Sequence, residues 1–324
     1  MNKINIPPRI ALRPNLPTPI ERLDRLFPNH QVYCKREDLT GTLLSGNKVR
    51  KLEFCLHEAL EQKADTLLTV GGIQSNHARC TAAVAAMLGM KSVLLLREGE
   101  NQNKPEGNYL LDRLLGSEIH WISKKEYKNH PQRLTQLSQQ LTQQGRYPYI
   151  VAEGGSSALG SLGYVLVMEE LMQQAEPFDY IVTAVGSGGT FAGLYAGAKL
   201  FSPETQVIGI NVYLDTVYFQ NRCFQLLQEI AEKYQTPSPE SPKDLDIRDR
   251  FVGPGYAQIG PKEKECIRRV ASQSGLFLDP AYTSKAFLGM EDLVKDLPEN
   301  KRVLFMHTGG IFGLMVTHLD YFSS

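Results

Sequence analysis

The sequence predicts an α/β protein whose parallel sheets are covered by helices on both faces. Apolar, β-rich runs alternate with helical patterns over nearly the whole chain, and this alternation is typical of α/β folds. The strand-like runs are continuously apolar rather than alternating, which indicates strands buried on both faces of a parallel sheet. A length of 324 residues suits two domains better than one.

The elements follow one another in a regular order from about residue 65. Strands are expected at 64–72, 91–98, 117–123, 147–155, 179–186, 206–213, 275–279 and 302–310. Helices are expected at 77–88, 106–115 and 131–144, with further helical patterns between the later strands. Small residues at 153–163 predict a break, and the proline-rich, charged segment 234–249 predicts an exposed loop. The sequence shows no internal repeat.

A helix is also predicted to begin at Lys48, within the segment LLSGNKVRKLEF of residues 43–54. A projection at about 100° per residue puts Lys48 on the arc that holds Leu52, Cys55, Leu56 and Ala59. The opposite side of the helix holds Arg50, Glu53, His57 and Glu61. Lysine is rarely buried without a partner or a role. Helix geometry by itself favours a lysine that reaches back to water, and the alternative is a lysine with a chemical function.

Composition and charge exclude several classes of function. Thirty-five basic residues balance thirty-five acidic ones, so no overall field favours nucleic acid or an anionic membrane. No run approaches the roughly 18–20 apolar residues of a membrane span, and the proline-rich start of the chain lacks the apolar core of a signal peptide. We therefore expect a soluble, cytoplasmic protein.

Cysteine and histidine usage point in the same direction. The five cysteines are scattered and never spaced as C-x-x-C, which argues against a disulfide framework and for a reducing compartment. The seven histidines show no metal-ligand spacing, so no metal site is predicted.

Three predicted strands end in glycine-rich or polar turns, at 69–80, 184–194 and 305–315, and SGNK at 45–48 is a fourth turn of this kind. Ligands of open α/β sheets bind beyond such strand ends. One turn combines glycines with hydroxyl groups that could hold a phosphate at a helix start. Its residues are Gly186, Ser187, Gly188, Gly189 and Thr190. A dinucleotide fingerprint matches only in part, because Phe191 stands at the sixth position. The turn alone leaves the two interpretations open.

Two other turns carry polar side chains at predicted helix starts. Ser75 is a predicted N-cap, and the polar cluster with Asn76 and His77 favours a site for a carboxylate. Tyr282 and Thr283 lie at a later strand–helix turn, where Tyr282 alone is typical of a half-buried aromatic residue. Thr308 lies at the last Gly-Gly turn, where it suits a strand end equally well.

Several of these segments together resemble one family. They are KREDLTGTLLSGNKVRKLEF, GGIQSNHARCTAAVAA, VGSGGTFAGL, LDPAYTSKA and MHTGGIFGL, in the same order over residues 8–320. The family is the D-cysteine desulfhydrase and 1-aminocyclopropane-1-carboxylate deaminase group of enzymes that use pyridoxal 5′-phosphate. The resemblance implies the tryptophan-synthase-β-like fold, with two doubly wound domains and the active site in the cleft between them. It implies a large domain of residues 1–45 and 156–324, a small domain of residues 46–155, and a homodimer.

The resemblance also implies roles for individual residues. Lys48 would bind the cofactor aldehyde covalently and act on the substrate, and Lys51 would reach the phosphate, which the loop 186–190 also binds. Ser75, Asn76 and His77 would bind the substrate carboxylate, with Asn76 also contacting the cofactor's phenolic oxygen. Tyr256 and Tyr282 would lie beside the substrate. Ser75 and Tyr282 are catalytic candidates together with Lys48, and Tyr282 would assist proton transfer or hold the leaving group. Ala257 departs from the family, which usually has glycine there, and this puts side-chain specificity in doubt.

Thr283 and Thr308 separate the two activities of the family. Deaminases resemble one another in having glutamate and leucine at these positions, whereas desulfhydrases have threonine at both. A neutral hydroxyl beside the cofactor ring suffices when a good leaving group departs from the β-carbon. The resemblance therefore favours a lyase that converts D-cysteine, a small amino acid, to pyruvate, hydrogen sulfide and ammonia.

Other functions stay open at this point. The same scaffold could deaminate 1-aminocyclopropane-1-carboxylate, or eliminate from D-serine or β-chloro-D-alanine. A NAD-dependent oxidoreductase would use the Gly186 turn but leaves Lys48 and Lys51 unexplained. A protein that binds the cofactor without turnover is a third class, because a fold does not by itself establish a function.

Overall fold

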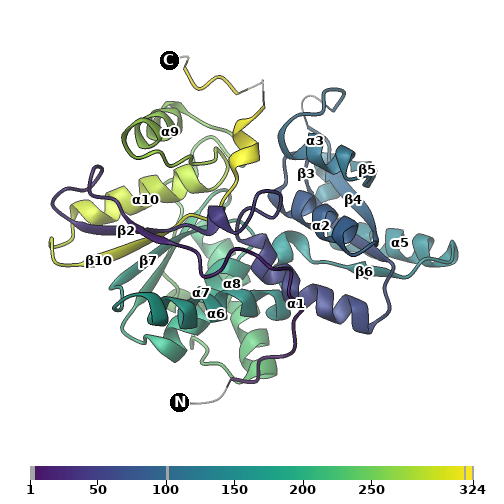
Figure 1. Ribbon diagram of the computed structural model, residues 1–324, viewed down its shortest axis with the longest axis horizontal. Coiled ribbons are helices and arrows are strands. Elements are labelled where there is room, and N and C mark those ends of the chain that lie inside the picture. Colours follow the sequence, from purple (N-terminus) through teal and green to yellow (C-terminus); the bar gives the residue numbers. More distant parts are fainter. Residues whose placement is uncertain (1–3, 100–101, 317–318, 323–324) are drawn as a thin grey trace.

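The computed structural model describes residues 4–99, 102–316 and 319–322, which form two sheets flanked by helices (Figure 1). The larger sheet has the strand order β1-β2-β10-β7-β8-β9 and the smaller has the order β5-β4-β3-β6. Every described strand pair is parallel except β1 with β2. The predicted α/β class with mostly parallel sheets is therefore confirmed.

The strands of the larger sheet are β1 (Ile20–Arg22), β2 (Gln31–Lys35), β7 (Tyr180–Val185), β8 (Gln206–Asn211), β9 (Ile247–Arg248) and β10 (Arg302–Met306). Those of the smaller sheet are β3 (Thr66–Gly72), β4 (Lys91–Arg97), β5 (Glu118–Ile122) and β6 (Pro148–Ile150). Seven of the eight expected strands are present. The predicted domain boundaries fall between strands of different sheets and stay a prediction; the outermost residues of the large domain, 1–3 and 323–324, lie outside the described ranges.

One strand prediction, for residues 275–279, is wrong. The segment joins no sheet, since β10 already pairs with β2 on one side and β7 on the other. Leu276 and Leu278 pack into the core of the larger sheet, which explains the apolar run, while Phe277 is 53% exposed. The Phe277 carbonyl faces the ring of His307 rather than a neighbouring strand.

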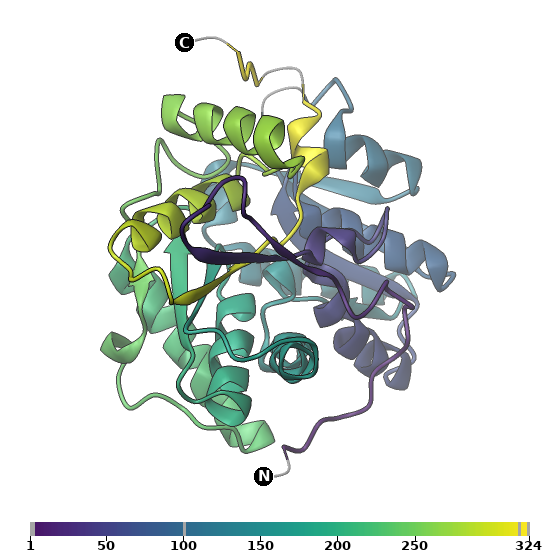
Figure 2. The ribbon, with the colours of Figure 1, turned by 60° about the vertical axis from the view of Figure 1, so that its left-hand side comes forward.

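Helices cover both faces of the larger sheet. One face is covered by α9 (Pro261–Ser274) and α10 (Thr283–Lys295), which lie together in both ribbon views (Figures 1 and 2). The other is covered by α6 (Ala158–Gln174), α7 (Gly189–Phe201) and α8 (Thr216–Tyr234). Two hydrophobic clusters correspond to these two faces. The sheet is therefore buried on both sides, as its continuous apolar strands predict.

The smaller sheet is covered in the same way. Helices α2 (Asn76–Met87) and α3 (Gly107–Leu114) pack on one side, and α5 (His130–Gln143) packs on the other, preceded by the short α4 (Lys124–Tyr127). Helix α1 (Lys48–Glu61) contacts both α2 and α6, so it lies between the two groups of elements (Figure 1). The 3₁₀ turn η4 (Ile311–Leu314), near the C-terminal end, packs beside α3 (Figure 2).

Helix α1 begins at Lys48 as predicted, but its second face is buried at Arg50 and Glu53 and points to water only near its end, at Glu61. Arg50 is 2% exposed and Glu53 is 4% exposed. Glu53 accepts the N–H of Leu12 and pairs with Arg9, so the N-terminal segment covers this face. The helical projection separates apolar from charged residues but does not show which charges are buried, because a charge with a partner can be buried.

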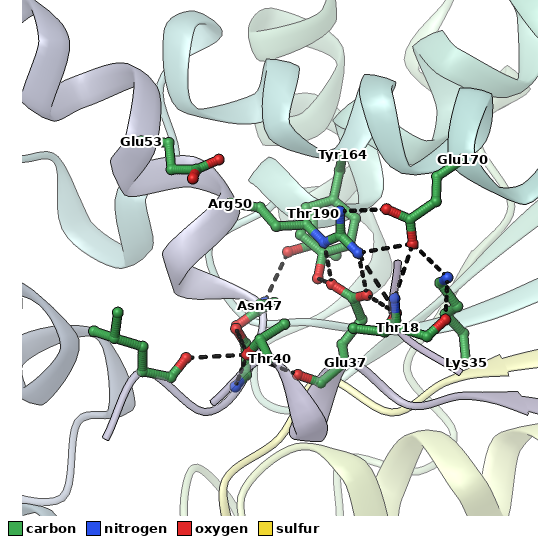
Figure 3. A network of polar contacts seen from close by, with 12 residues as sticks. Thr18, Lys35, Glu37, Thr40, Asn47, Arg50, Glu53, Tyr164, Glu170 and Thr190 are labelled. Atoms are coloured by element: carbon green, nitrogen blue, oxygen red, sulfur yellow. Dashed lines mark hydrogen bonds and ion pairs between the residues drawn. The ribbon is translucent and has the colours of Figure 1, made fainter. Parts of the chain in front are cut away.

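Arg50 belongs to a buried ionic network that joins α1 to the larger sheet (Figure 3). Its guanidinium donates to both oxygens of Glu37 at 2.6 and 2.8 Å, and to both oxygens of Glu170 at 2.9 and 3.0 Å. Lys35 donates to Glu170 at 2.5 Å, and the Tyr164 hydroxyl donates to Glu37 at 2.9 Å. Although burial opposes it, the Arg50 charge holds the pKa of Glu37 below its ordinary value.

The proline-rich segment 234–249 is only partly the exposed loop that its composition predicts. Ser241 caps the 3₁₀ turn η3 (Pro242–Asp244), and β9 then adds a short edge strand to β8. Leu245 and Ile247 are buried in the core. No helix in the described ranges is both long and apolar enough to cross a membrane.

Candidate active site

A cavity lies where the predicted turns of both sheets meet. Its lining comes from the ends of β3, β7 and β10 and from the start of α1, as expected for a site beyond the carboxyl ends of parallel strands. The predicted site residues in the lining are Lys48, Ser75, Asn76, His77, Gly186, Ser187, Gly188, Thr190, Tyr256, Tyr282 and Thr308. Lys51, Gly189 and Thr283 lie behind this lining.

Lys48 is the first residue of α1 and lines the cavity. The preceding turn is held against the last Gly-Gly turn, since the Asn47 N–H donates to the Thr308 carbonyl at 3.1 Å. Gly46 has a φ of +102°, and a Cβ there would lie 2.7 Å from the same carbonyl oxygen, so this close approach requires glycine. Burial lowers the pKa of Lys48 to about 8. Its amine is therefore available as a nucleophile and a base near neutral pH.

The glycine-rich turn after β7 leads into the N-terminus of α7. Gly188, with a φ of +90°, occupies the N-cap without a side-chain cap, so the helix start has no side-chain oxygen of its own. Ser156 fills this place instead. Its hydroxyl oxygen accepts the N–H of Gly189 at 3.1 Å and lies 2.7 Å from the Ser187 hydroxyl oxygen. Lys51 donates to the same Ser156 oxygen at 3.3 Å.

The surroundings of Lys51 indicate whether the start of α7 suits a phosphate. Its side chain is 1% exposed, and its hydrogen-bond partners are the Gly154 carbonyl and the Ser156 hydroxyl. No carboxylate in the described part of the chain forms an ion pair with it. Burial, together with the nearby Lys48, lowers its pKa well below the ordinary value. A buried amine beside a helix N-terminus, without an acidic partner, fits an anionic group such as a phosphate, whose charge would favour the protonated amine.

The turn after β3 is an N-capped helix start, as predicted. The Ser75 hydroxyl oxygen accepts the N–H of Ala78 at 3.1 Å. The first N–H groups of α2, from Asn76 and His77, have no acceptor inside the helix. Both residues line the cavity, so these donors and the helix dipole suit a carboxylate.

The side chain of His77 is engaged elsewhere. Its Nε2 atom lies 2.8 Å from the hydroxyl of Thr69, and burial lowers its pKa well below the ordinary value. The ring is thus neutral, and any contact of His77 with a carboxylate would come from its backbone N–H. The sequence alone does not show whether the ring or the backbone N–H of His77 would make the contact.

Two tyrosines meet on another wall of the cavity. The hydroxyl oxygens of Tyr256 and Tyr282 lie 2.5 Å apart. A Cβ at Gly186 would lie 2.8 Å from the Tyr282 ring, so glycine allows this ring to reach the cavity. Ala257 follows with a φ of +57°, in the left-handed region that favours glycine.

Thr283 and Thr308 have different surroundings. Thr308 lines the cavity. Thr283 is fully buried, and its hydroxyl donates to Asp279 at 2.7 Å. Asp279 also accepts the N–H groups of Ala281, Tyr282 and Thr283, and so holds the start of α10. Thr283 thus supports the turn that presents Tyr282, while Thr308 alone of the pair faces the cavity.

Five further residues contribute to the site without having been predicted from the sequence. They are Asn47, Tyr127, Glu153, Ser156 and Tyr213. Asn47 could have been predicted, because it belongs to the SGNK turn that directly precedes Lys48. Its side chain donates to Thr190 at 2.9 Å. Glu153 and Ser156 lie in the small-residue segment that we interpreted as a break. The two tyrosines gave no local signal because their place depends on how the sheets pack.

Metal ligands are not assembled in the described part of the chain, where no group of three or more His, Cys, Asp or Glu side chains could hold an ion. The five cysteines are buried and free.

Comparisons with known proteins agree with the resemblance in the sequence. Residues 12–309 match the model of a family described as pyridoxal-phosphate dependent enzyme. A D-cysteine desulfhydrase of Salmonella paratyphi A is 38% identical over 323 residues, covering 96% of each chain. A mitochondrial bifunctional D-cysteine desulfhydrase/1-aminocyclopropane-1-carboxylate deaminase of Arabidopsis thaliana is 39% identical over 317 residues, covering 93% of this chain and 78% of that protein.

A solved structure is equally similar. The crystal structure of an ACC deaminase homologue superposes with a TM-score of 0.88 at 37% identity, covering 95% of this chain and 93% of that chain. An O-ureido-L-serine synthase superposes with a TM-score of 0.70 at 17% identity, which shows a shared fold alone.

Proposed function

Since the chain belongs to the family of pyridoxal-phosphate-dependent enzymes, we propose that it is a lyase that releases the β-substituent of a small D-amino acid, with D-cysteine as the preferred substrate. The observation that carries this proposal is the position of the Lys48 amine, in one cavity with a helix start suited to a carboxylate and a loop suited to a phosphate. When bound, pyridoxal 5′-phosphate supplies an electron sink that stabilises negative charge at the substrate Cα.

We assign the binding of the two anionic groups to two helix starts. The N–H groups at the start of α7, with Ser187, Thr190 and the buried Lys51, would hold the cofactor phosphate. The start of α2, with Ser75 and Asn76, would hold the substrate carboxylate. Thr308 would place a neutral hydroxyl beside the cofactor ring. Lys48 would carry the cofactor, as its lowered pKa and its place in the lining support.

Proton transfer falls to two of the lining residues. In this proposal the Lys48 amine takes the proton from Cα, since an amine with a pKa near 8 accepts protons readily at neutral pH. Tyr282 holds or protonates the leaving group, and Tyr256 orients the Tyr282 hydroxyl through their 2.5 Å contact. For D-cysteine, the Cβ–S bond breaks with its electron pair on sulfur. One water then completes the release of pyruvate, hydrogen sulfide and ammonia.

Deamination of 1-aminocyclopropane-1-carboxylate is the second candidate. The name of the Arabidopsis relative includes both activities. Thr283 and Thr308 favour the desulfhydrase, because neither supplies an acidic group to the cofactor ring. A homodimer and a cytoplasmic location also belong to the proposal; light scattering of the purified protein tests the former.

The test is a product assay on D- and L-cysteine, D-serine, β-chloro-D-alanine and 1-aminocyclopropane-1-carboxylate. We expect pyruvate from D-cysteine at the highest kcat/KM and a visible absorption band that Lys48→Ala removes. Lys63→Ala, at an exposed lysine just beyond α1, should keep both. A colourless protein, or one that binds NAD instead, contradicts the proposal. Production of 2-oxobutyrate at a higher kcat/KM than pyruvate selects the second candidate.

A further inference from the structure

The wall of the cavity that binds neither predicted anion contains a carboxylate. Glu153 begins the 3₁₀ turn η2 (Glu153–Gly155), which follows β6. Among the described residues that line the cavity, Glu153 is the one acidic side chain. Its side chain is 31% exposed, so it lies at the surface of the cavity rather than in the core.

Tyrosine rings surround this carboxylate. Tyr127, Tyr213 and Tyr256 line the same cavity, and the Tyr127 hydroxyl donates to Glu153. The rings of Tyr213 and Tyr256 meet edge to face, with centroids 5.4 Å apart. Aromatic faces carry partial negative charge and attract cations. Carboxylate and rings therefore give this wall negative potential, which the guanidinium of Arg97, stacked on the rings of Tyr127 and Tyr256, offsets in part.

Two basic groups act on Glu153 in the described part of the chain without a hydrogen bond to it. The Nε2 atom of His130 lies 3.7 Å from its second oxygen, beyond hydrogen-bond distance. The carboxylate also acts on the Lys48 amine across the cavity, where it raises the pKa of Lys48 against the effect of burial. Arg97 stacks on the rings of Tyr127 and Tyr256 at 5.3 and 5.5 Å, and forms no ion pair with Glu153. One carboxylate oxygen thus keeps its capacity to accept a hydrogen bond from a ligand.

The other walls account for the negative groups of substrate and cofactor. The start of α2 suits the substrate carboxylate, and the start of α7 with Lys51 suits the cofactor phosphate. The substrate group that remains is its β-substituent, and the wall that remains is that of Glu153 and the tyrosines. An anion there would be repelled by the carboxylate, whereas a cation would be attracted.

We propose that Glu153 selects the charge of the β-substituent, so that the site accepts amino acids with a cationic β-substituent, such as 2,3-diaminopropionate, and rejects those with an anionic one. This inference rests on the proposed lyase function. With 2,3-diaminopropionate, the Cα proton passes to Lys48 and the Cβ–N bond breaks with its electron pair on nitrogen, releasing ammonia. One water then hydrolyses the remaining enamine to pyruvate and a second ammonia.

The test compares the holoenzyme with Glu153→Gln, which keeps the shape of the side chain and removes its charge. We expect the variant to lose about tenfold in kcat/KM for 2,3-diaminopropionate, the size typical of a charged hydrogen bond. Turnover of β-chloroalanine, which has a neutral β-substituent, should change little. Glu61→Gln, at an exposed glutamate of α1, is the matched control. Equal losses for both substrates, or no loss for either, overturn the inference.

A binding measurement separates this inference from the proposed function. Spectral titration of the cofactor band with aspartate and with asparagine compares an anionic and a neutral side chain of equal size. The wild type should bind asparagine more tightly, and Glu153→Gln should remove about a tenfold preference. Unchanged discrimination overturns the role of Glu153. If β-chloroalanine is not turned over, the lyase function fails, and the titration still decides the charge selection.

Discussion

The hydroxyl oxygens of Tyr256 and Tyr282 lie 2.5 Å apart, which joins the loop at 252–260 to the start of α10. The two tyrosines are distant in the sequence, but both line the cavity. Burial and the neighbouring Tyr256 raise the pKa of Tyr282 well above its ordinary value. The Tyr282 hydroxyl therefore keeps its proton at neutral pH and can donate a hydrogen bond. Its contact with the Tyr256 hydroxyl holds it in position.

Removal of the Tyr282 hydroxyl should slow turnover. We expect Tyr282→Phe to lower kcat about 100-fold, the size of a lost general acid, with a small change in KM. Tyr256→Phe breaks the same contact but leaves the Tyr282 hydroxyl in place, so its kcat should fall much less. Steady-state kinetics on D-cysteine measures both. Equal losses in the two variants would contradict the separate role of Tyr282.

Lys285 should be required for the position of the Tyr256 loop. Its ammonium is fully buried and donates to the carbonyls of Val212, Val252 and Gly255 at 3.1, 2.7 and 2.5 Å. Lys285→Met leaves these carbonyls without their donor, and we expect a loss of about 3 kcal/mol in the free energy of unfolding.

Urea unfolding measures this loss, and KM for the substrate should rise as the loop moves. Lys295→Met, at an exposed lysine in the last turn of the same helix, should change neither quantity. A Lys285→Met variant with wild-type stability would show that the three carbonyls find other donors.

Cofactor uptake should depend on pH through Lys48. Burial lowers its pKa to about 8, so the reactive amine is a minor species at pH 6 and the major one above pH 8. The rate at which the cofactor-free protein gains its visible band should therefore rise about tenfold per pH unit below 8 and level off above it. Stopped-flow absorbance from pH 6 to 9.5 measures this profile.

Burial also lowers the pKa of Lys285 to about 8. The profile of cofactor uptake should nevertheless be the same in Lys285→Met, because that lysine does not line the cavity. If the rate of cofactor uptake does not change between pH 6 and 9.5, titration of Lys48 does not control this step.

The two functions of Ser75 should be separable. Ser75→Ala removes the N-cap of α2 and should cost about 1 kcal/mol of stability. Ser75→Asp retains a capping oxygen, so its stability should stay close to that of the wild type, but it places a negative charge at the predicted carboxylate site. KM should then rise at least as much in Ser75→Asp as in Ser75→Ala. Thermal unfolding and kinetics on the same preparations test the pair; a normal KM in Ser75→Asp places the substrate carboxylate elsewhere.

The ionic network of α1 should be a major source of stability. Arg50→Met leaves the fully buried Glu37 without its main cationic partner and should cost about 3–5 kcal/mol. Arg22→Met breaks an exposed pair with Asp24 and should cost less than about 1 kcal/mol. Urea unfolding of both variants gives the comparison. Similar small losses in the two would mean that Glu37 is protonated or solvated once Arg50 is gone.

Local patterns were sufficient to predict most of the elements and the turns that line the cavity. The start of α1 at Lys48, the Ser75 cap of α2 and seven strands follow from periodicity, capping chemistry and apolar runs, which act over a few residues. The same patterns failed at residues 275–279, where an apolar segment packs into the core without a strand partner. They also give no sign that Arg50 is buried, because its burial depends on an ionic partner that is distant in the chain.

The sequence by itself determined the fold class and the glycine-rich turns, since each depends on residues that are neighbours in the chain. Only the tertiary structure decided what surrounds Lys48. Strand β10 lies between β2 and β7, which brings Thr308 to the turn before Lys48 from 260 positions away. Glu153, Ser156 and the wall of tyrosines reach the cavity in the same way. Such contacts depend on the order of strands in a sheet, which many weak, non-local interactions decide together and no local pattern encodes.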